Sequence, residues 1–216
     1  MCGRFTLYAD PDFLKEQFDL ENEEVLKEIE PRYNIAPSQD ILTIVRGKKQ
    51  NRAGYMKWGL VPSWAKDPSI GYKMINARSE TAHEKPSFKH LLKKRRCLIC
   101  ASGFYEWKKI DGEKHPYYIQ LPSQQLMVFA GLWDRYVTSD QTLITCTILT
   151  TKSNAVMNPI HHRMPVMLSG SEQEDWLLGK KPVELFETKP ESLAISPVSQ
   201  YVNSPKHEGE RCVESI

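Results

Sequence analysis

The chain has 216 residues, 40% of them apolar, which suffices for a sizeable core, and we expect one domain over residues 1–216. The 29 basic and 27 acidic residues leave a net charge of +2, so composition alone does not indicate a nucleic-acid-binding protein. No apolar run reaches the roughly 18 to 20 residues of a membrane span, and the first residues lack the pattern of a secretion signal, so we expect a cytoplasmic protein. Five cysteines without framework spacing also favour a reducing compartment.

Few segments have a helical pattern. Asp10 and Pro11 precede an apolar periodic stretch, which indicates a capped helix with proline in its first turn. Near the C-terminal end, Ser171 and Glu174 have the spacing of a capping box. The other predicted helices are 22–30, 84–94 and 153–158.

Most of the remaining chain has patterns typical of β-strands. Asp111-Gly112 and Ser139-Asp140 each separate two strand candidates, as antiparallel hairpins require. The predicted strands are 3–8, 41–46, 53–58, 97–108, 116–121, 126–136, 142–150, 164–168 and 193–199. These elements predict an α+β domain built around a large, mostly antiparallel, barrel-like β-sheet with a few short helices.

Residues that could bind metal do not form a convincing site. Cys97 and Cys100 have zinc-ligand spacing, but they lie in an apolar strand, where positions three apart face opposite sides. We therefore interpret them as core cysteines. His161-His162 lacks the partner residues that a metal site needs, so we expect no metal and no cofactor. The motifs of serine hydrolases and of P-loop nucleotide hydrolases are also absent.

Four short stretches carry polar residues that a packed strand or a turn would not select. Asn76 and Arg78 fall on the same side of an extended segment. Glu106 lies between two aromatic residues, where burial would raise its pKa toward the range of a general acid. The other two stretches are Cys2-Gly3-Arg4 and the segment 160–165, in which His161 lies two residues before Arg163.

Each of these residues also has an ordinary structural explanation. Asn76 could brace a turn, Glu106 could pair with a lysine, and His161 could be a satisfied core histidine. Taken together, a cysteine, an amide, a carboxylate and an imidazole, with arginine beside three of them, resemble a nucleophilic site that holds an anionic substrate.

Cys2 has chemistry that an internal cysteine lacks. Cells generally remove the initiator methionine when the second residue is small, which would leave Cys2 with a free α-amine next to its thiol. An α-amine with a pKa near ~8 is partly neutral at physiological pH and condenses with an aldehyde to an imine. The thiol of the same residue can then close on the imine carbon to form a five-membered thiazolidine. Because this second step is intramolecular, its barrier can fall by about 7 kcal/mol or more.

The stretches MCGRF, RYNIAPSQ, WGLVPSW, INARSET, GFYEWKK, HHRMPVML and VSQYVN, taken as an ordered set, resemble the SRAP (SOS response associated peptidase) family. The resemblance runs from residue 2 to about residue 212. It implies capture of abasic sites in single-stranded DNA, through a thiazolidine with the aldehyde of the ring-opened deoxyribose. The implied partner is single-stranded DNA containing abasic sites, met by a monomer in the cytoplasm, at the nucleoid when bound to DNA.

The resemblance also implies a role for each matching residue. Cys2 is expected to be the crosslinking nucleophile, and Asn76 is expected to hydrogen-bond the opened sugar. Glu106 and His161 are expected to move protons during ring opening, imine formation, closure and reversal. The remaining implied residues contact DNA: Arg4, Arg78 and Arg163 at phosphates, and Pro37, Trp58 and Trp64 as candidates for a wedge that kinks the strand.

One position departs from the family pattern, and three other activities are alternatives to covalent capture of abasic sites. His162 follows the catalytic histidine where many relatives carry aspartate, which puts the pKa of His161 and the reversal rate in doubt. Glutamine amidotransferases also begin Met-Cys-Gly, but they continue differently from Arg4-Phe5. The chain could instead bind single-stranded DNA without a covalent bond. Finally, Cys2 could serve as an autoproteolytic peptidase that removes the residue before it.

Overall fold

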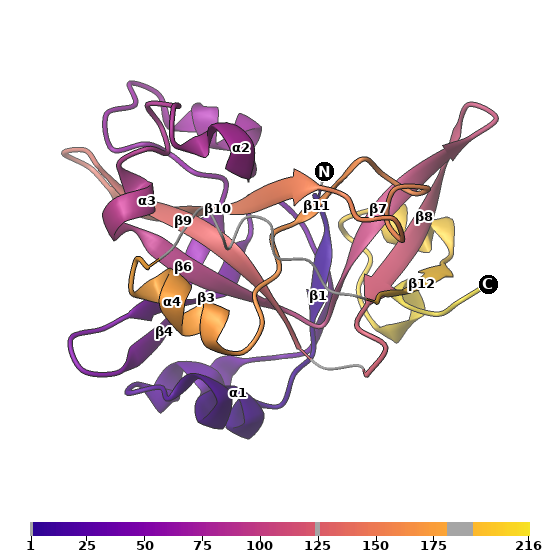
Figure 1. Cartoon of the computed structure of the whole chain (residues 1–216), viewed down its shortest axis with the longest axis horizontal. Helices are drawn as coiled ribbons and strands as arrows, with labels where there is room; N and C mark the ends of the chain where they lie inside the picture. Colours follow the sequence, from indigo (N-terminus) through magenta and orange to yellow (C-terminus); the bar gives the residue numbers. More distant parts are fainter. Residues whose placement is uncertain (1, 124–125, 181–191) are drawn as a thin grey trace.

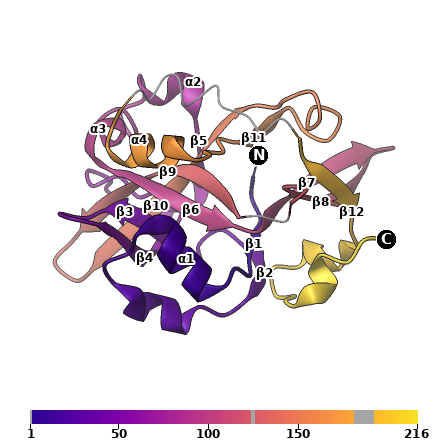
Figure 2. The same ribbon diagram turned by 60° about the horizontal axis from the view of Figure 1, so that its bottom comes forward.

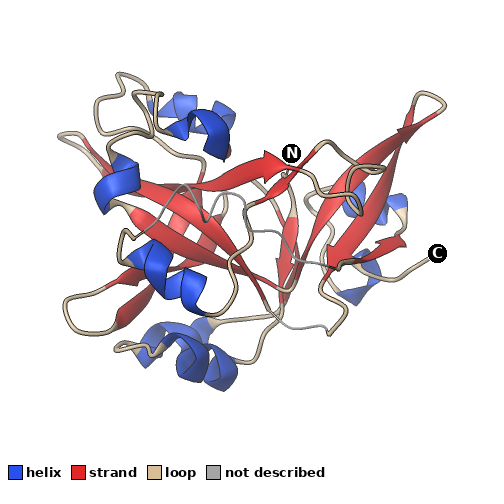
Figure 3. Cartoon of the chain, in the orientation of Figure 1, coloured by secondary structure: helices blue, strands red, loops and turns tan. Residues whose placement is uncertain are grey.

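The computed structural model describes residues 2–123, 126–180 and 192–216. Strands dominate it, and the helices are short (Figure 3). The helices are α1 (Pro11–Phe18), η1 (Glu23–Glu28), η2 (Pro68–Lys73), α2 (Ser79–Ala82), α3 (Leu91–Lys94), α4 (Ser171–Leu177), η3 (Gln200–Asn203) and η4 (Glu210–Cys212). The strands are β1 (Phe5–Leu7), β2 (Arg32–Ile35), β3 (Asp40–Arg46), β4 (Asn51–Trp58), β5 (Asn76–Arg78), β6 (Arg96–Ala101), β7 (Gly103–Ile110), β8 (Glu113–Gln120), β9 (Met127–Val137), β10 (Thr142–Lys152), β11 (Arg163–Pro165) and β12 (Ala194–Pro197).

A closed barrel forms the larger part of the molecule. Its strands follow the order β10-β4-β3-β6-β9, and the ring closes because β9 also pairs with β10. All of these pairs are antiparallel except β10 with β4, which pair in parallel at Thr145↔Lys57 and Cys146↔Trp58. The prediction of a mostly antiparallel, barrel-like α+β fold is confirmed.

The second sheet packs beside the barrel in the order β12-β8-β7-β1-β2. In Figure 1, β1 runs between the barrel strands and the β7–β8 pair, and Figure 2 shows the same arrangement from another side. The ring of Phe5, on β1, meets the ring of Trp58 at 5.3 Å and that of Phe129 at 6.3 Å, both edge to face. Because Trp58 and Phe129 belong to barrel strands, β1 packs against the barrel and the two sheets share one hydrophobic core.

The far half of β10 extends beyond the barrel and carries two short strands. Residues 148–150 of β10 pair in parallel with β5, at Ile148↔Asn76. Residues 150–152 pair with β11 in the antiparallel sense, at Lys152↔Arg163. This extension places the stretches around residues 76 and 163 on the two edges of the same strand, although they are far apart in the sequence.

Local sequence signals explain the regular turns and the first helix. The Asp10 side chain accepts hydrogen bonds from the backbone N–H groups of residues 12 and 13, and Pro11 opens α1, as predicted. Asp111 and Gly112 both have positive φ and form the two-residue turn of the β7–β8 hairpin. The predicted hairpin at Ser139-Asp140 also exists, since Val137 pairs with Thr142.

Several predicted elements differ from the observed ones. The predicted strand 97–108 is two strands, β6 and β7, because the chain crosses between the sheets at Ser102. The helix predicted at 84–94 forms only as α3 at its end, and the segment 153–158 contains turns. The predicted capping box of Ser171 and Glu174 does not form: Ser171 is the first residue of α4, and the N–H and hydroxyl of Ser169 both donate to Glu172 at 2.9 Å instead.

All five cysteines are free and buried, so Cys97 and Cys100 are core residues as predicted. None of the helices in the described ranges has the length and apolar character that a membrane crossing requires.

Candidate functional site

Four elements bring the predicted catalytic residues together. Cys2 comes just before β1, which pairs with β7 at Phe5↔Phe104, and the N–H of Tyr105 donates to the carbonyl of Arg4 at 2.9 Å. Continued by two residues, this register brings the start of the chain alongside Glu106. Asn76 begins β5, and His161 lies in the loop before β11. The site therefore forms at the junction between the second sheet and the extension of the barrel.

Asn76 contacts Cys2 directly. Its side-chain N–H donates to the backbone carbonyl of Cys2 at 2.8 Å. Its side-chain oxygen is buried and has no hydrogen-bond partner in the described part of the chain. A buried acceptor of this kind is costly unless a donor reaches it. The sugar hydroxyl that the sequence reading assigned to Asn76 would be such a donor.

Glu106 and His161 form an acid–base pair. The Glu106 Oε1 atom lies 3.9 Å from His161 Nδ1, with the two side chains 4% and 21% exposed. Burial lowers the pKa of His161, while the negative charge of Glu106 raises it in part. The imidazole is therefore neutral at pH 7 and able to accept a proton.

The backbone of Arg163 orients the imidazole. Its N–H donates to His161 Nδ1 at 3.0 Å, and its carbonyl oxygen lies 3.1 Å from the same nitrogen. When the neutral imidazole accepts the amide proton at Nδ1, its own proton must sit on Nε2. On protonation, Nδ1–H can instead donate to the carbonyl or to Glu106. The two backbone groups thus accommodate both protonation states.

The thiol of Cys2 is neutral in this environment. The residue is fully buried, and burial followed by the negative charge of Glu106 raises the pKa of the thiol well above its usual range. A neutral thiol that attacks an electrophile needs a base to accept its proton.

A cavity of about 460 Å³ opens beside this pair of residues and is lined by Glu106, Trp107, Lys114, His161 and Asn203. The Trp107 indole N–H donates to the Asn203 side-chain oxygen at 2.7 Å, which fixes the far wall. Sequence reasoning did not single out Lys114 or Asn203. Asn203 is the last residue of the stretch VSQYVN, which could have indicated it. Lys114 could have been found from the predicted Asp111-Gly112 hairpin, which pairs it with Lys109.

Comparison with known proteins assigns the chain to a family. A family model described as SOS response associated peptidase (SRAP) matches residues 1–205. The chain belongs to the SRAP family. The abasic site processing protein YoqW of Bacillus subtilis is 46% identical over 223 residues, which cover all of both proteins. The abasic site processing protein HMCES of Xenopus tropicalis is 31% identical, with 100% of this chain and 78% of that protein covered.

Solved structures agree on the SRAP fold. A crystal structure of a protein from Bacteroides thetaiotaomicron matches with a TM-score of 0.88, over all of both chains, at 24% identity. A phage-related protein from Bordetella bronchiseptica matches with a TM-score of 0.72 at 27% identity, over 97% of this chain and all of that one.

The three arginines that the SRAP resemblance assigned to phosphates occupy different environments. Arg78 is exposed at the end of β5, and its phosphate contact stays a prediction. Arg4 is partly buried, and its Nη1 donates to the Asn34 side chain at 2.7 Å and to the Val202 carbonyl at 2.9 Å. Arg163 departs from the prediction: its side chain is 8% exposed and pairs with Glu80, so it faces the protein and not solvent.

The three wedge candidates also differ. Trp58 is fully buried, and its indole N–H donates to the carbonyl of Ile75 at 2.9 Å. The wedge predicted at Trp58 is therefore wrong, because a core residue cannot insert between bases without unpacking the barrel. Trp64 is 59% exposed and Pro37 is half-buried, so both stay candidates.

No group of three or more His, Cys, Asp or Glu side chains that could hold a metal ion occurs within residues 2–123, 126–180 and 192–216. The polar groups that gather at the junction are instead a thiol, an amide, a carboxylate and an imidazole, all of which can act without a metal.

Proposed function

We propose that this SRAP protein processes abasic sites in single-stranded DNA by forming a thiazolidine between Cys2 and the ring-opened deoxyribose. The observation that carries the proposal is the convergence of Cys2, Asn76, Glu106 and His161 at one junction, from four separate elements. The names of the relatives YoqW and HMCES support abasic sites as the substrate.

The proposed chemistry is balanced without a cofactor. After removal of Met1, the α-amine of Cys2 attacks the C1′ aldehyde, and the resulting carbinolamine loses water to give an imine. The sulfur then bonds to the same carbon, and its proton passes through the Glu106–His161 pair to the imine nitrogen. One water leaves and no electrons are transferred. Reversal follows the same steps backwards.

The pocket favours this order of steps. The Cys2 thiol is neutral, whereas an α-amine with a pKa near ~8 is partly deprotonated at pH 7. The hydrogen bond from Asn76 to the Cys2 carbonyl holds the backbone of the nucleophile, which keeps the sulfur over the imine carbon. The protein would act as a monomer, since each group in the site comes from one chain.

The test uses an oligonucleotide with a single abasic site and a denaturing gel. Wild-type protein is expected to give a slow, heat-resistant band that Cys2→Ala loses. Cys2→Ser retains the amine without the sulfur, so it should give a band only after trapping with borohydride. Cys212→Ser is the matched control. Cys212 is buried outside the site, so this variant should crosslink through Cys2 as wild type does.

Three outcomes would contradict the proposal. Normal crosslinking by protein that retains an uncleaved N-terminal tag would exclude the α-amine. Binding in a native gel without a denaturing band would indicate a noncovalent DNA-binding module. Release of ammonia from glutamine would favour an amidotransferase.

A further inference from the structure

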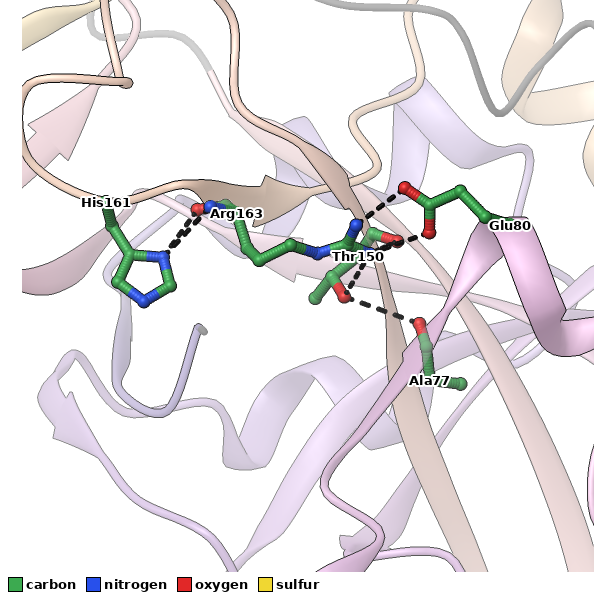
Figure 4. Close-up of polar contacts among 5 residues, drawn as sticks. All are labelled: Ala77, Glu80, Thr150, His161 and Arg163. Atoms are coloured by element: carbon green, nitrogen blue, oxygen red, sulfur yellow. Dashed lines mark hydrogen bonds and ion pairs between the residues drawn. The ribbon is translucent and has the colours of Figure 1, made fainter.

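The side chain of Arg163 joins two segments of the site. Its Nη1 and Nη2 donate to the two carboxylate oxygens of Glu80, at 2.6 and 2.9 Å. Nη2 also donates to the carbonyl and the hydroxyl of Thr150, at 2.6 and 3.1 Å. Figure 4 shows the guanidinium between Glu80 and Thr150, with His161 at the opposite end of the residue. This two-pronged geometry is the strong form of an arginine–carboxylate pair.

The main chain of the same residue holds the imidazole. The Arg163 N–H donates to His161 Nδ1 at 3.0 Å, which favours the tautomer with its proton on Nε2, and the Arg163 carbonyl, 3.1 Å from Nδ1, can accept once that nitrogen is protonated. Any shift of residue 163 changes this contact directly. The side chain fixes residue 163 against β10, so it also fixes the amide that His161 accepts from.

The carboxylate end leads to Asn76. Glu80 is the second residue of α2, which follows β5 without a break. The Thr150 hydroxyl donates to the carbonyl of Ala77 at 3.5 Å, directly after Asn76 (Figure 4). One ion pair therefore ties the segment that carries Asn76 to the residue that orients His161.

The arginine end of the pair is buried, while the carboxylate end is partly exposed. The Arg163 side chain is 8% exposed and that of Glu80 is 38% exposed. Removal of the carboxylate would leave the arginine charge in a buried position without its counter-ion. The guanidinium would then shift toward other acceptors or solvent and carry β11 with it.

We propose that the Glu80–Arg163 ion pair is a positioning device that holds His161 in its Nε2-protonated tautomer and in register with Asn76 and Cys2. The expected effect on crosslinking rests on the proposed function. The expected effect on His161 itself does not.

The pKa of His161 distinguishes two effects that Glu80 could have on it: a direct effect of its charge and an indirect effect through the position of residue 163. Among the described residues, the charged or titratable groups around it are Glu106 at 3.9 Å, the stacked ring of His162 with centroids 4.3 Å apart, and Lys114, which lines the same cavity. Loss of the negative charge of Glu80 would, by itself, lower the pKa of His161 further. Loss of position exposes the ring and removes the amide donor to Nδ1, which raises that pKa toward its usual value.

The experiment compares wild type and Glu80→Gln, each with ¹⁵N-labelled histidine, by long-range ¹H–¹⁵N spectra across pH 5 to 9. Wild type is expected to show the Nε2–H tautomer with a lowered pKa of His161. Glu80→Gln should show mixed tautomers, a pKa of His161 closer to 6.5, and crosslinking about 10-fold slower or more. Arg163→Lys, which keeps charge and amide but loses the two-pronged contact, should reproduce these changes even if Glu80→Gln folds poorly.

The matched control is Glu23→Gln, which breaks the exposed Lys15–Glu23 pair and should change neither His161 nor the rate. A wild-type tautomer and pKa of His161 in Glu80→Gln would overturn the proposal, even if the melting temperature fell. Tighter DNA binding by Glu80→Gln with an unchanged tautomer would also overturn it, because Arg163 would then be a phosphate contact that Glu80 restrains. If wild type forms no crosslink, the proposed function fails, while the His161 titration still decides this inference.

Discussion

The surroundings of Cys2 keep its thiol protonated until, in the proposed mechanism, the sulfur attacks the imine carbon. Burial and the charge of Glu106 keep the thiol neutral, so it reacts poorly with adventitious electrophiles. The same carboxylate lies 3.9 Å from His161 and can accept the thiol proton when the sulfur attacks. In the proposed mechanism, Glu106 thus suppresses reaction without substrate and assists it with substrate.

Replacement of Glu106 by Gln should therefore separate chemistry from binding. The amide keeps the shape of the side chain but cannot carry a proton, so crosslink formation should slow by about 100-fold or more. The affinity for intact single-stranded DNA should change little. Single-turnover gels and a binding titration measure the two quantities. Glu113→Gln, an exposed carboxylate on the same hairpin, is the control, and equal rates in the two variants would remove Glu106 from the mechanism.

A candidate catalytic residue could be predicted from the sequence where its position gives it a reactivity that other positions lack. Cys2 stood out because an N-terminal aminothiol has chemistry that an internal cysteine lacks, and the structure places Asn76 against it as an ordered site requires. The burial of Trp58 and the pairing of Arg163 with Glu80 could not be predicted, because aromatic and cationic side chains occur both in a core and at a DNA surface. Only tertiary packing decides which of these surroundings a residue meets.

At the scale of elements, long strands could be predicted and short ones could not. The hairpin β7–β8 follows from alternation and an Asp-Gly turn, which are local. Strand β5 has three residues and exists because β10 offers it a parallel partner, at Ile148↔Asn76. The predicted helix 84–94 forms only turns before α3, although its local pattern is helical. The elements that position the site are those that depend most on tertiary contacts.

The link between α2 and β11 should make stability depend on pH. Burial would raise the pKa of Glu80, but the hydrogen bonds and charge of Arg163 outweigh it and lower that pKa below 4.5. A carboxyl group with a lowered pKa stabilises the fold above its unfolded value and loses this contribution as pH falls through the folded one.

Wild type should therefore exceed Glu80→Gln in free energy of unfolding at pH 7, and the difference should shrink as the pH falls below about 4.5. Denaturant unfolding at pH 7, 5, 4 and 3 measures it. The partial exposure of Glu80 limits the part that comes from ionisation to about 1 kcal/mol. A difference that stays constant from pH 7 to 3 would show that the charge of Glu80 does not contribute.

At the scale of the whole molecule, charge placement matters more than net charge. A balance of +2 gives little attraction for DNA, yet exposed cations lie on the segments that carry the site. Lys114 lines the cavity beside Glu106 and His161, and Arg78 ends the strand that Asn76 begins. We predict that an anionic strand bound at the site contacts both cations, one on each sheet.

Arg78→Ala and Lys114→Gln should each weaken binding of single-stranded DNA by a similar factor at every sequence, because phosphate contacts carry no base information. Each should also reduce the slope of log affinity against log salt by about 0.7, the value for one phosphate contact on a single strand. Fluorescence anisotropy between 50 and 300 mM salt measures both effects, with Lys27→Gln, on the distant η1, as the control. In the double variant, the two reductions of the slope should add, because the two contacts would lie on different sheets. A loss that depends on the neighbouring bases, or an unchanged slope, would show that these cations do not contact the DNA backbone.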